Sequence, residues 1–280
     1  MVASALPLSA LPLSANAVSA DDLNHLIGTD ACPVIVDVRR RAAFDKADAM
    51  IATAIWRDHA AAADWADSLP DGASVVVYCV HGHAISQSAA ATLRALGVDS
   101  YYLDGGIEHF ADAGGVTVKR GLVPEDRPSI WVTRERPKID RIACPWFIRR
   151  FIDPDAVFHY VGKEFVADVA TETGGIPYDI PDVDFSHVGE NCSFDAFVAW
   201  SGIKDPALDR LAEIVRGADT GKLDLAPECA GLLAASLGLS ALYEDDDLAM
   251  LDAGMAVYDA LFAWARHAAA ETHNWAPKPA

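Results

Sequence analysis

Cys79 stands in a sequence setting that favours a reactive thiol. It follows the apolar run 75–78, which predicts a buried strand, and it precedes a predicted helix at about 84–96. The loop between the two consists of Val80, His81, Gly82, His83 and Ala84. A loop that enters a helix in this way points backbone N–H groups and the positive end of the helix dipole at the sulfur. Since such surroundings stabilise a thiolate or an anionic persulfide, the pattern predicts Cys79 as a nucleophile.

A second chemical feature is a basic segment in the second half. Its six basic residues stand against only two acidic ones, Glu135 and Asp140. They are Arg134, Arg136, Lys138, Arg141, Arg149 and Arg150. Guanidinium groups gathered beside aromatic residues suit a tetrahedral dianion, and the alternative is a solvated helix face held by salt bridges.

The third feature is the loop that contains His187, Glu190 and Cys192. These three residues lie within six positions and could bind a metal ion or an anion, although the spacing is not a recognised zinc pattern. A hydrogen-bonded core histidine is the alternative interpretation of His187. Three more carboxylates could complete a metal site if the fold brings them near: Glu213, Asp219 and Glu228.

Composition limits the class of protein. The formal net charge of −19 over 280 residues disfavours a general surface for nucleic acid or anionic membranes. The five cysteines form no C-x-x-C pair, so neither a zinc knuckle nor a disulfide framework is predicted, and a reducing, cytoplasmic compartment is expected. The start of the chain is a poor secretory signal, and we expect no membrane-spanning helix.

The order of the elements predicts two domains. In the first half, apolar runs at 34–38, 54–56, 75–78 and 100–103 alternate with predicted helices, which is typical of a doubly wound parallel α/β sheet. The second half is predicted as α+β, with strands at 130–133, 157–161 and 183–186 and helices at its end. We expect domains at 1–120 and 129–270, a linker at 121–128 and a tail at 271–280.

Several motifs of the first half occur together in one family. They are Asp37-Val38-Arg39, Tyr78-Cys79-x-x-Gly82, Ala89-Ala90 with Leu93, and Leu103-Asp104-Gly105-Gly106-Ile107. In order and spacing, residues 16–118 resemble the rhodanese family of sulfurtransferases. The resemblance implies a doubly wound α/β fold in which Cys79 takes sulfane sulfur from a donor and passes it to an acceptor thiol or to cyanide.

The loop departs from the rhodanese pattern in one respect. Active rhodaneses commonly carry Arg or Lys within or just after the loop, whereas this one has His81 and His83. A histidine supplies positive charge less reliably at neutral pH, so we expect less efficient use of the dianion thiosulfate. Arg39 is expected to be structural, paired with Asp37 or Asp104, and the alternative is that it helps to hold an anion.

The motifs of the second half also occur together in a known family. They are RPKIDRIACPWFIRRFID at 136–153, HVGENCSFD at 187–195 and IVRGAD at 214–219. Residues 129–267 resemble the C-terminal domain of the chromate-resistance, chromate-sensing proteins. The resemblance implies a role in the chromate response and points to Arg134, Arg141 and His187 as oxyanion-binding residues. Regulatory members carry a DNA-binding region ahead of this domain, and here a rhodanese-like segment takes its place, so direct DNA binding is not expected.

Three hypotheses follow. The first is a sulfurtransferase that works through a Cys79 persulfide, takes a small sulfur donor and a thiol acceptor, needs no cofactor, and is coupled to a domain for chromate or a similar oxyanion. The second is a non-catalytic oxyanion sensor that uses the rhodanese fold for docking. The third is a metal-dependent redox enzyme in the second half.

Overall fold

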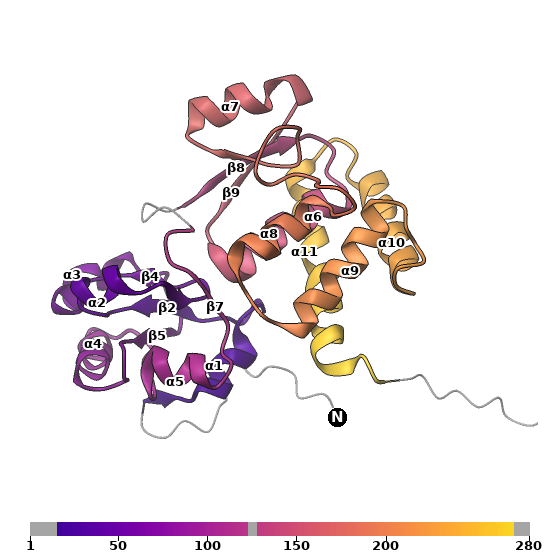
Figure 1. Cartoon of the computed structure of the whole chain (residues 1–280). Helices are drawn as coiled ribbons and strands as arrows, with labels where there is room; N and C mark the ends of the chain where they lie inside the picture. The colour runs from indigo at the N-terminus through magenta and orange to yellow at the C-terminus, as the bar shows by residue number, and fades with distance from the viewer. Residues whose placement is uncertain (1–15, 123–127, 272–280) are drawn as a thin grey trace, which may run out of the picture.

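The computed structural model describes residues 16–122 and 128–271 of the chain. Figure 1 shows the α/β first half, in indigo to magenta, beside a second half in which helices dominate. The repeated run at 4–15, most of the predicted linker at 121–128 and nearly all of the predicted tail at 271–280 lie outside the described residues.

A five-stranded parallel sheet forms the centre of the first half, in the order β1-β6-β5-β2-β4. Its strands are β1 (Ala17–Val18), β2 (Val34–Asp37), β4 (Ile55–Trp56), β5 (Val75–Tyr78) and β6 (Ser100–Leu103). Its helices are α1 (Ala20–Leu26), α2 (Arg41–Lys46), α3 (Ala62–Trp65), α4 (Ala84–Ala95) and α5 (Gly106–Asp112). Strands β3 (Ala49–Ile51) and β7 (Thr117–Lys119) form a separate antiparallel pair. The predicted parallel α/β fold of this half is confirmed.

Side chains of the sheet alternate between two helical layers, as the period of a strand requires. Val75 and Val77 belong to the core cluster formed with α3 and α4, whereas Val76 and Tyr78 belong to the cluster that includes α1 and α5. Cys79 continues the first of these faces. The strand end that carries the thiol is therefore held by packing on both sides.

The second half is an α+β unit that ends in helices, as predicted. Its parallel sheet, in the order β10-β8-β9, consists of β8 (Ile130–Arg134), β9 (Val157–Val161) and β10 (Ile176–Pro177). Its helices are α6 (Ile139–Phe147, extended by a π-helical turn to Ile152), α7 (Val166–Thr173), α8 (Ser193–Ser201), α9 (Pro206–Asp219), α10 (Cys229–Leu242) and α11 (Asp247–Ala263).

The strand predicted at 183–186 is wrong. The segment contributes a single bridge, between Phe185 and Tyr178, and runs otherwise through turns that include Asp182 at φ 63°. Phe185 is buried because its ring stacks on Phe197 with 4.3 Å between centroids. Its apolar character therefore serves an aromatic cluster and not a strand ladder.

The two halves share one hydrophobic core. The cluster that contains Leu23 and Tyr78 of the first half also contains Phe151 and Phe262 of the second. Hydrogen bonds cross the boundary as well: the Thr53 N–H donates to the Phe151 carbonyl at 3.0 Å, and the Arg266 side chain donates through Nη1 to the Ile27 carbonyl at 2.9 Å. The halves are thus packed firmly against each other.

One helix of the described residues, Asp247–Ala268, is long and apolar enough to cross a membrane by length and composition, with a mean hydropathy of 1.3. The expectation that no segment reaches this length is therefore wrong. The helix also has features of a packed core helix. It buries Leu251, Tyr258 and Phe262, and its Asp259 pairs with Arg150 of the π-helical turn at 2.7 Å.

Candidate functional site

The loop that carries Cys79 is fixed by close backbone approach. Gly82 has a φ of +69°, and a Cβ there would lie 2.6 Å from the Leu103 carbonyl oxygen. The Cys79 carbonyl accepts a hydrogen bond from the Ile107 N–H at 3.0 Å, and the Val80 carbonyl accepts one from Glu108 at 3.2 Å. The backbone of the Leu103–Ile107 motif therefore packs against the loop and fixes its conformation.

Hydrogen bonds to the Cys79 sulfur favour its thiolate form. Burial raises the pKa of this thiol, since only 4% of the residue is exposed. The Ser86 hydroxyl, 3.2 Å from the sulfur, and the backbone N–H groups of Ser86, His81 and His83 outweigh burial, so the pKa lies below its ordinary value. This is the electrostatic setting that the sequence predicts for a nucleophilic cysteine.

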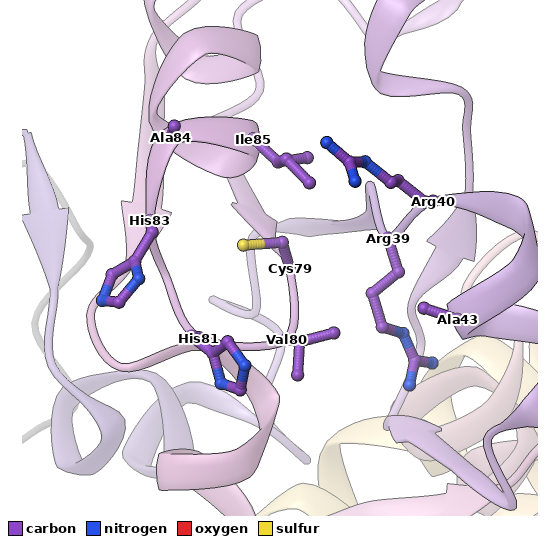
Figure 2. Close-up of a pocket in the computed structure, with 9 residues that line it drawn as sticks. All are labelled: Arg39, Arg40, Ala43, Cys79, Val80, His81, His83, Ala84 and Ile85. Atoms are coloured by element: carbon purple, nitrogen blue, oxygen red, sulfur yellow. The ribbon is translucent and has the colours of Figure 1, made fainter.

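The sulfur opens into a pocket of about 390 Å³. Figure 2 shows the residues that line it: Arg39, Arg40, Ala43, Cys79, Val80, His81, His83, Ala84 and Ile85. Aliphatic side chains from the loop and from α2 form much of this lining. The volume lies within the range of pockets that hold small molecules.

The two arginines of the pocket have different roles. Arg39 is buried and donates to the Asp37 carboxylate through Nε at 2.9 Å and Nη2 at 2.6 Å, which confirms the expected pairing with Asp37. Arg40 is exposed, and no carboxylate among the described residues pairs with it. In Figure 2 its guanidinium lies on the Ile85 side of the pocket, whereas that of Arg39 points away from the sulfur. The positive charge that the loop lacks is thus available from the segment after β2.

The three oxyanion-binding candidates of the second half meet at one carboxylate, whereas Arg136, Arg149 and Arg150 pair with other acidic residues. Arg134 Nη2 and Arg141 Nε lie 2.5 and 3.2 Å from Asp179 Oδ2, and His187 Nε2 lies 3.5 Å from Asp179 Oδ1. The three side chains come from β8, from α6 and from the loop before α8, so the fold joins segments that are far apart in sequence. The arrangement can hold an anion or be a closed ion-pair network.

Two more carboxylates contact the same histidine. His187 Nε2 lies 3.1 Å from Asp140 Oδ2 and 3.3 Å from Asp219 Oδ2. The hydrogen bond to Asp140 raises the pKa of His187 to about 9. Burial, together with the charge of Asp140, raises the pKa of Asp219 to about 7. At neutral pH this cluster therefore holds a protonated imidazole among its carboxylates.

The metal ligands predicted around His187 are not brought together. Glu190 is exposed and pairs with Lys222, and the buried Cys192 thiol caps α8 by accepting a hydrogen bond from the Asp195 N–H. Both Glu213 and Glu228 pair with Arg210. Of the suggested carboxylates only Asp219 lies beside His187.

Among the described residues, the ligand atoms of Asp140, His187 and Asp219 lie within 4.8 Å of one another. Imidazole and carboxylate donors of this kind suit a divalent transition-metal ion. Any metal in this half would therefore use His187 with Asp140 and Asp219, and not the Glu190 and Cys192 predicted from the sequence.

Several residues of these sites do not stand out in the sequence. Ser86 is one turn into a predicted helix, and only its position seven residues after Cys79 could have suggested a contact. Arg40 directly follows Arg39 in the sequence, but only Arg39 belongs to the family motif. Asp179 gives no signal at all, because its role depends on how β10 is placed beside β8.

Comparisons with known proteins match both halves. Residues 19–113 match the rhodanese-like domain family, and residues 131–265 match the family described as ChrB, C-terminal domain. Protein ChrB of Cupriavidus metallidurans is 35% identical over 133 residues, which are 47% of this chain and 39% of that protein. The chain thus spans about two fifths of the length of this curated relative.

Solved structures resemble the first half. A rhodanese-related protein from Thermoplasma volcanium covers 37% of this chain and 97% of its own, with 24% identity and a TM-score of 0.33. The protein hp1203 from Helicobacter pylori covers 40% of this chain and 96% of its own, with 22% identity and a TM-score of 0.32. It is the matches to the two families that show that the chain joins a rhodanese-like domain to a ChrB C-terminal domain.

Proposed function

We propose that the protein is a sulfurtransferase in which Cys79 carries a persulfide. The observation that carries this proposal is the environment of the sulfur. The thiol lies at the inner end of a pocket, and its pKa is lowered by the Ser86 hydroxyl and loop N–H groups even though burial opposes this. A buried cysteine with only a packing role has no need of such donors.

The reaction takes place in two displacements. The Cys79 thiolate attacks the sulfane sulfur of the donor, so that a new S–S bond forms and the donor's own bond to that sulfur breaks. The electron pair leaves with the departing sulfite or thiolate. A thiolate or cyanide acceptor then attacks the outer sulfur of the persulfide and releases the Cys79 thiolate. No oxidant, reductant or cofactor is consumed.

Arg40 is proposed to hold the anionic end of the donor. It is the guanidinium of the pocket that has no carboxylate partner among the described residues, whereas Arg39 is occupied by Asp37. Arginine binds planar or tetrahedral oxyanions through paired N–H groups. An arginine from outside the loop supplies the charge that His81 and His83 provide only when protonated.

The second half is proposed to bind chromate or a similar oxyanion. Arg134, Arg141 and His187 come together from separate elements, which supports the role that the family resemblance assigns to them. A second candidate function, an oxyanion sensor that does not need sulfur transfer, rests on this same convergence. The five cysteines are free, which fits a reducing, cytoplasmic compartment.

Release of thiocyanate from a sulfane-sulfur donor and cyanide tests the enzyme. Cys79→Ser is expected to abolish it. Cys32→Ser is the matched control, since burial raises the pKa of the Cys32 thiol to about 12 and leaves it protonated, so this variant should keep the wild-type rate. An inactive wild type with thiosulfate, polysulfide and glutathione persulfide would leave the sensor as the function.

A further inference from the structure

Asp179 lies against all three of the oxyanion-binding candidates. Its Oδ2 atom accepts a hydrogen bond from Arg134 and pairs with the Arg141 guanidinium at 3.2 Å, and its Oδ1 atom lies 3.5 Å from His187 Nε2. An oxyanion that binds to these three cations must therefore compete with the Asp179 carboxylate for the two arginines, and at His187 also with Asp140 and Asp219.

The structure holds this carboxylate firmly in place. Asp179 is 3% exposed, its N–H donates to the Phe185 carbonyl at 2.8 Å, and the Ser193 hydroxyl donates to its Oδ1 at 3.0 Å. Its φ of +53° lies in the left-handed region, which Asp and Asn tolerate better than most residues. The side chain is thus fixed against the two guanidinium groups by several independent contacts.

One donor of the group remains without a partner. The Nε atom of Arg134 is buried and has no hydrogen-bond acceptor among the described residues. The site also opens to solvent, because the side chains of Arg134 and His187 are 35% and 42% exposed. A ligand with several oxygen atoms can therefore reach the group and use a donor that Asp179 leaves unsatisfied.

We propose that Asp179 determines the affinity and selectivity of this site by acting as a fixed, built-in anion with which the ligand competes for Arg134 and Arg141. The proposal rests on the oxyanion-binding function proposed above. A monoanion carries the same charge as the Asp179 carboxylate, so the two arginines gain no electrostatic stabilisation when they pair with it in place of Asp179. A tetrahedral dianion brings a second charge and more acceptor oxygens, so the site takes chromate or sulfate and rejects tetrahedral monoanions such as perchlorate.

Isothermal titration of the full chain tests this with sulfate, chromate and perchlorate. Asp179→Asn removes the charge while it keeps the shape of the side chain and tolerates the same backbone conformation. It is expected to bind sulfate and chromate about tenfold more tightly than the wild type, and to bind perchlorate measurably where the wild type does not. Asp182→Asn is the matched control, because Asp182 also has a positive φ, is exposed and lies in the same loop. It should bind as the wild type does.

The gain in affinity separates this role from a structural one, since loss of a merely structural contact would weaken binding. If Asp179→Asn does not fold by circular dichroism, Ser193→Ala keeps the charge but removes one hydrogen bond from the carboxylate, and should tighten sulfate binding by about two- to threefold. Wild-type binding that neither variant tightens overturns the inference and leaves the oxyanion site standing. Absence of binding to all of these proteins overturns both.

Discussion

The Sγ atom of Cys79 lies 3.2 Å from the Oγ atom of Ser86, which stands in the first turn of α4. The hydroxyl has one proton, which it donates to the His83 carbonyl at 3.2 Å or, when Cys79 is a thiolate, to the sulfur. The helix that follows the loop thus supplies a side-chain donor to the sulfur as well as its backbone N–H groups. The proposed chemistry of the first half therefore depends on Cys79 together with Ser86.

Replacement of Ser86 with alanine is expected to make the thiolate harder to form. A hydrogen bond to a charged group contributes about 1.5–3 kcal/mol, so the pKa of Cys79 should rise by about one unit or more. The pH dependence of Cys79 alkylation by iodoacetamide measures it, and the profile should move to higher pH. Ser88→Ala, on the exposed side of the same helix, should leave the profile unchanged. An unshifted profile in Ser86→Ala would remove this hydroxyl from the mechanism.

Arg40→Ala is expected to raise the KM for thiosulfate about tenfold, with little change in kcat, because the charge binds the donor and does not take part in bond breaking. An uncharged donor such as dimethyl trisulfide should be used equally well by variant and wild type. The control is Arg41→Ala, since Arg41 is next in sequence and pairs with Asp45. Equal losses with both donors would show that Arg40 acts on the fold of the pocket.

Gly28 is a point where the two halves touch. It has a φ of +84°, and a Cβ there would lie 2.7 Å from Phe151 and 2.8 Å from Phe262. Gly97 has a φ of +89°, and a Cβ there would have no heavy atom within 4 Å. An alanine at this position therefore measures only the cost of the left-handed backbone conformation.

The free energy of unfolding in urea should fall by about 1–2 kcal/mol in Gly97→Ala, and by about 1–3 kcal/mol more in Gly28→Ala. Equal effects of the two substitutions would contradict close packing between the halves at this position.

The pH dependence of stability should reflect the His187 cluster. Because the pKa of His187 is raised from 6.5 to about 9, its contribution is complete below pH 6.5 and is lost as the pH rises through 9. The pKa of Asp219, raised to about 7, acts in the same direction, with its contribution lost as the pH rises through 7. Solvent screening reduces the size of the His187 effect, since that side chain is 42% exposed.

Tm is therefore expected to fall between pH 6.5 and 9, and to fall less steeply in His187→Gln. His109→Gln, an exposed histidine of the first half, serves as the control. A Tm that rises over this range would contradict the protonated state of His187.

Much of the fold could be predicted because the local sequence pattern and the packing of the side chains favour the same strands and helices. The buried strands at 34–37 and 75–78 are short apolar runs between helices, and the start of α9 is set by Asp205, whose side chain accepts from the Ala207 N–H. The segment at 183–186 was predicted wrongly because Phe185 is buried by a ring stack that no local period reveals. The helical segment between β4 and β5 changes from 3-10 (His59–Ala61) to α (Ala62–Trp65) and back to 3-10 geometry (Ala66–Ser68), and the Trp65 indole N–H donates to the Asp58 carbonyl.

The two candidate sites also differ in how far the sequence could predict them. Cys79 could be identified because strand, loop and helix are consecutive in sequence, so one stretch of chain supplies most of the environment. The carboxylates around His187 could not be predicted, because Asp140 and Asp219 reach this side chain only through the packing of α6 and α9. Neighbours in sequence such as Glu190 and Cys192 point elsewhere, one to solvent and one to the cap of α8.

Mass spectrometry of the intact protein after incubation with a sulfane-sulfur donor tests the central claim most directly. A persulfide predicts an added mass of one sulfur atom, located on Cys79 by peptide mapping and removed by cyanide. The same addition should be absent from Cys79→Ser and present in Cys32→Ser. Unchanged mass with every donor, or sulfur located on another cysteine, would contradict the assignment of Cys79 as the sulfur carrier.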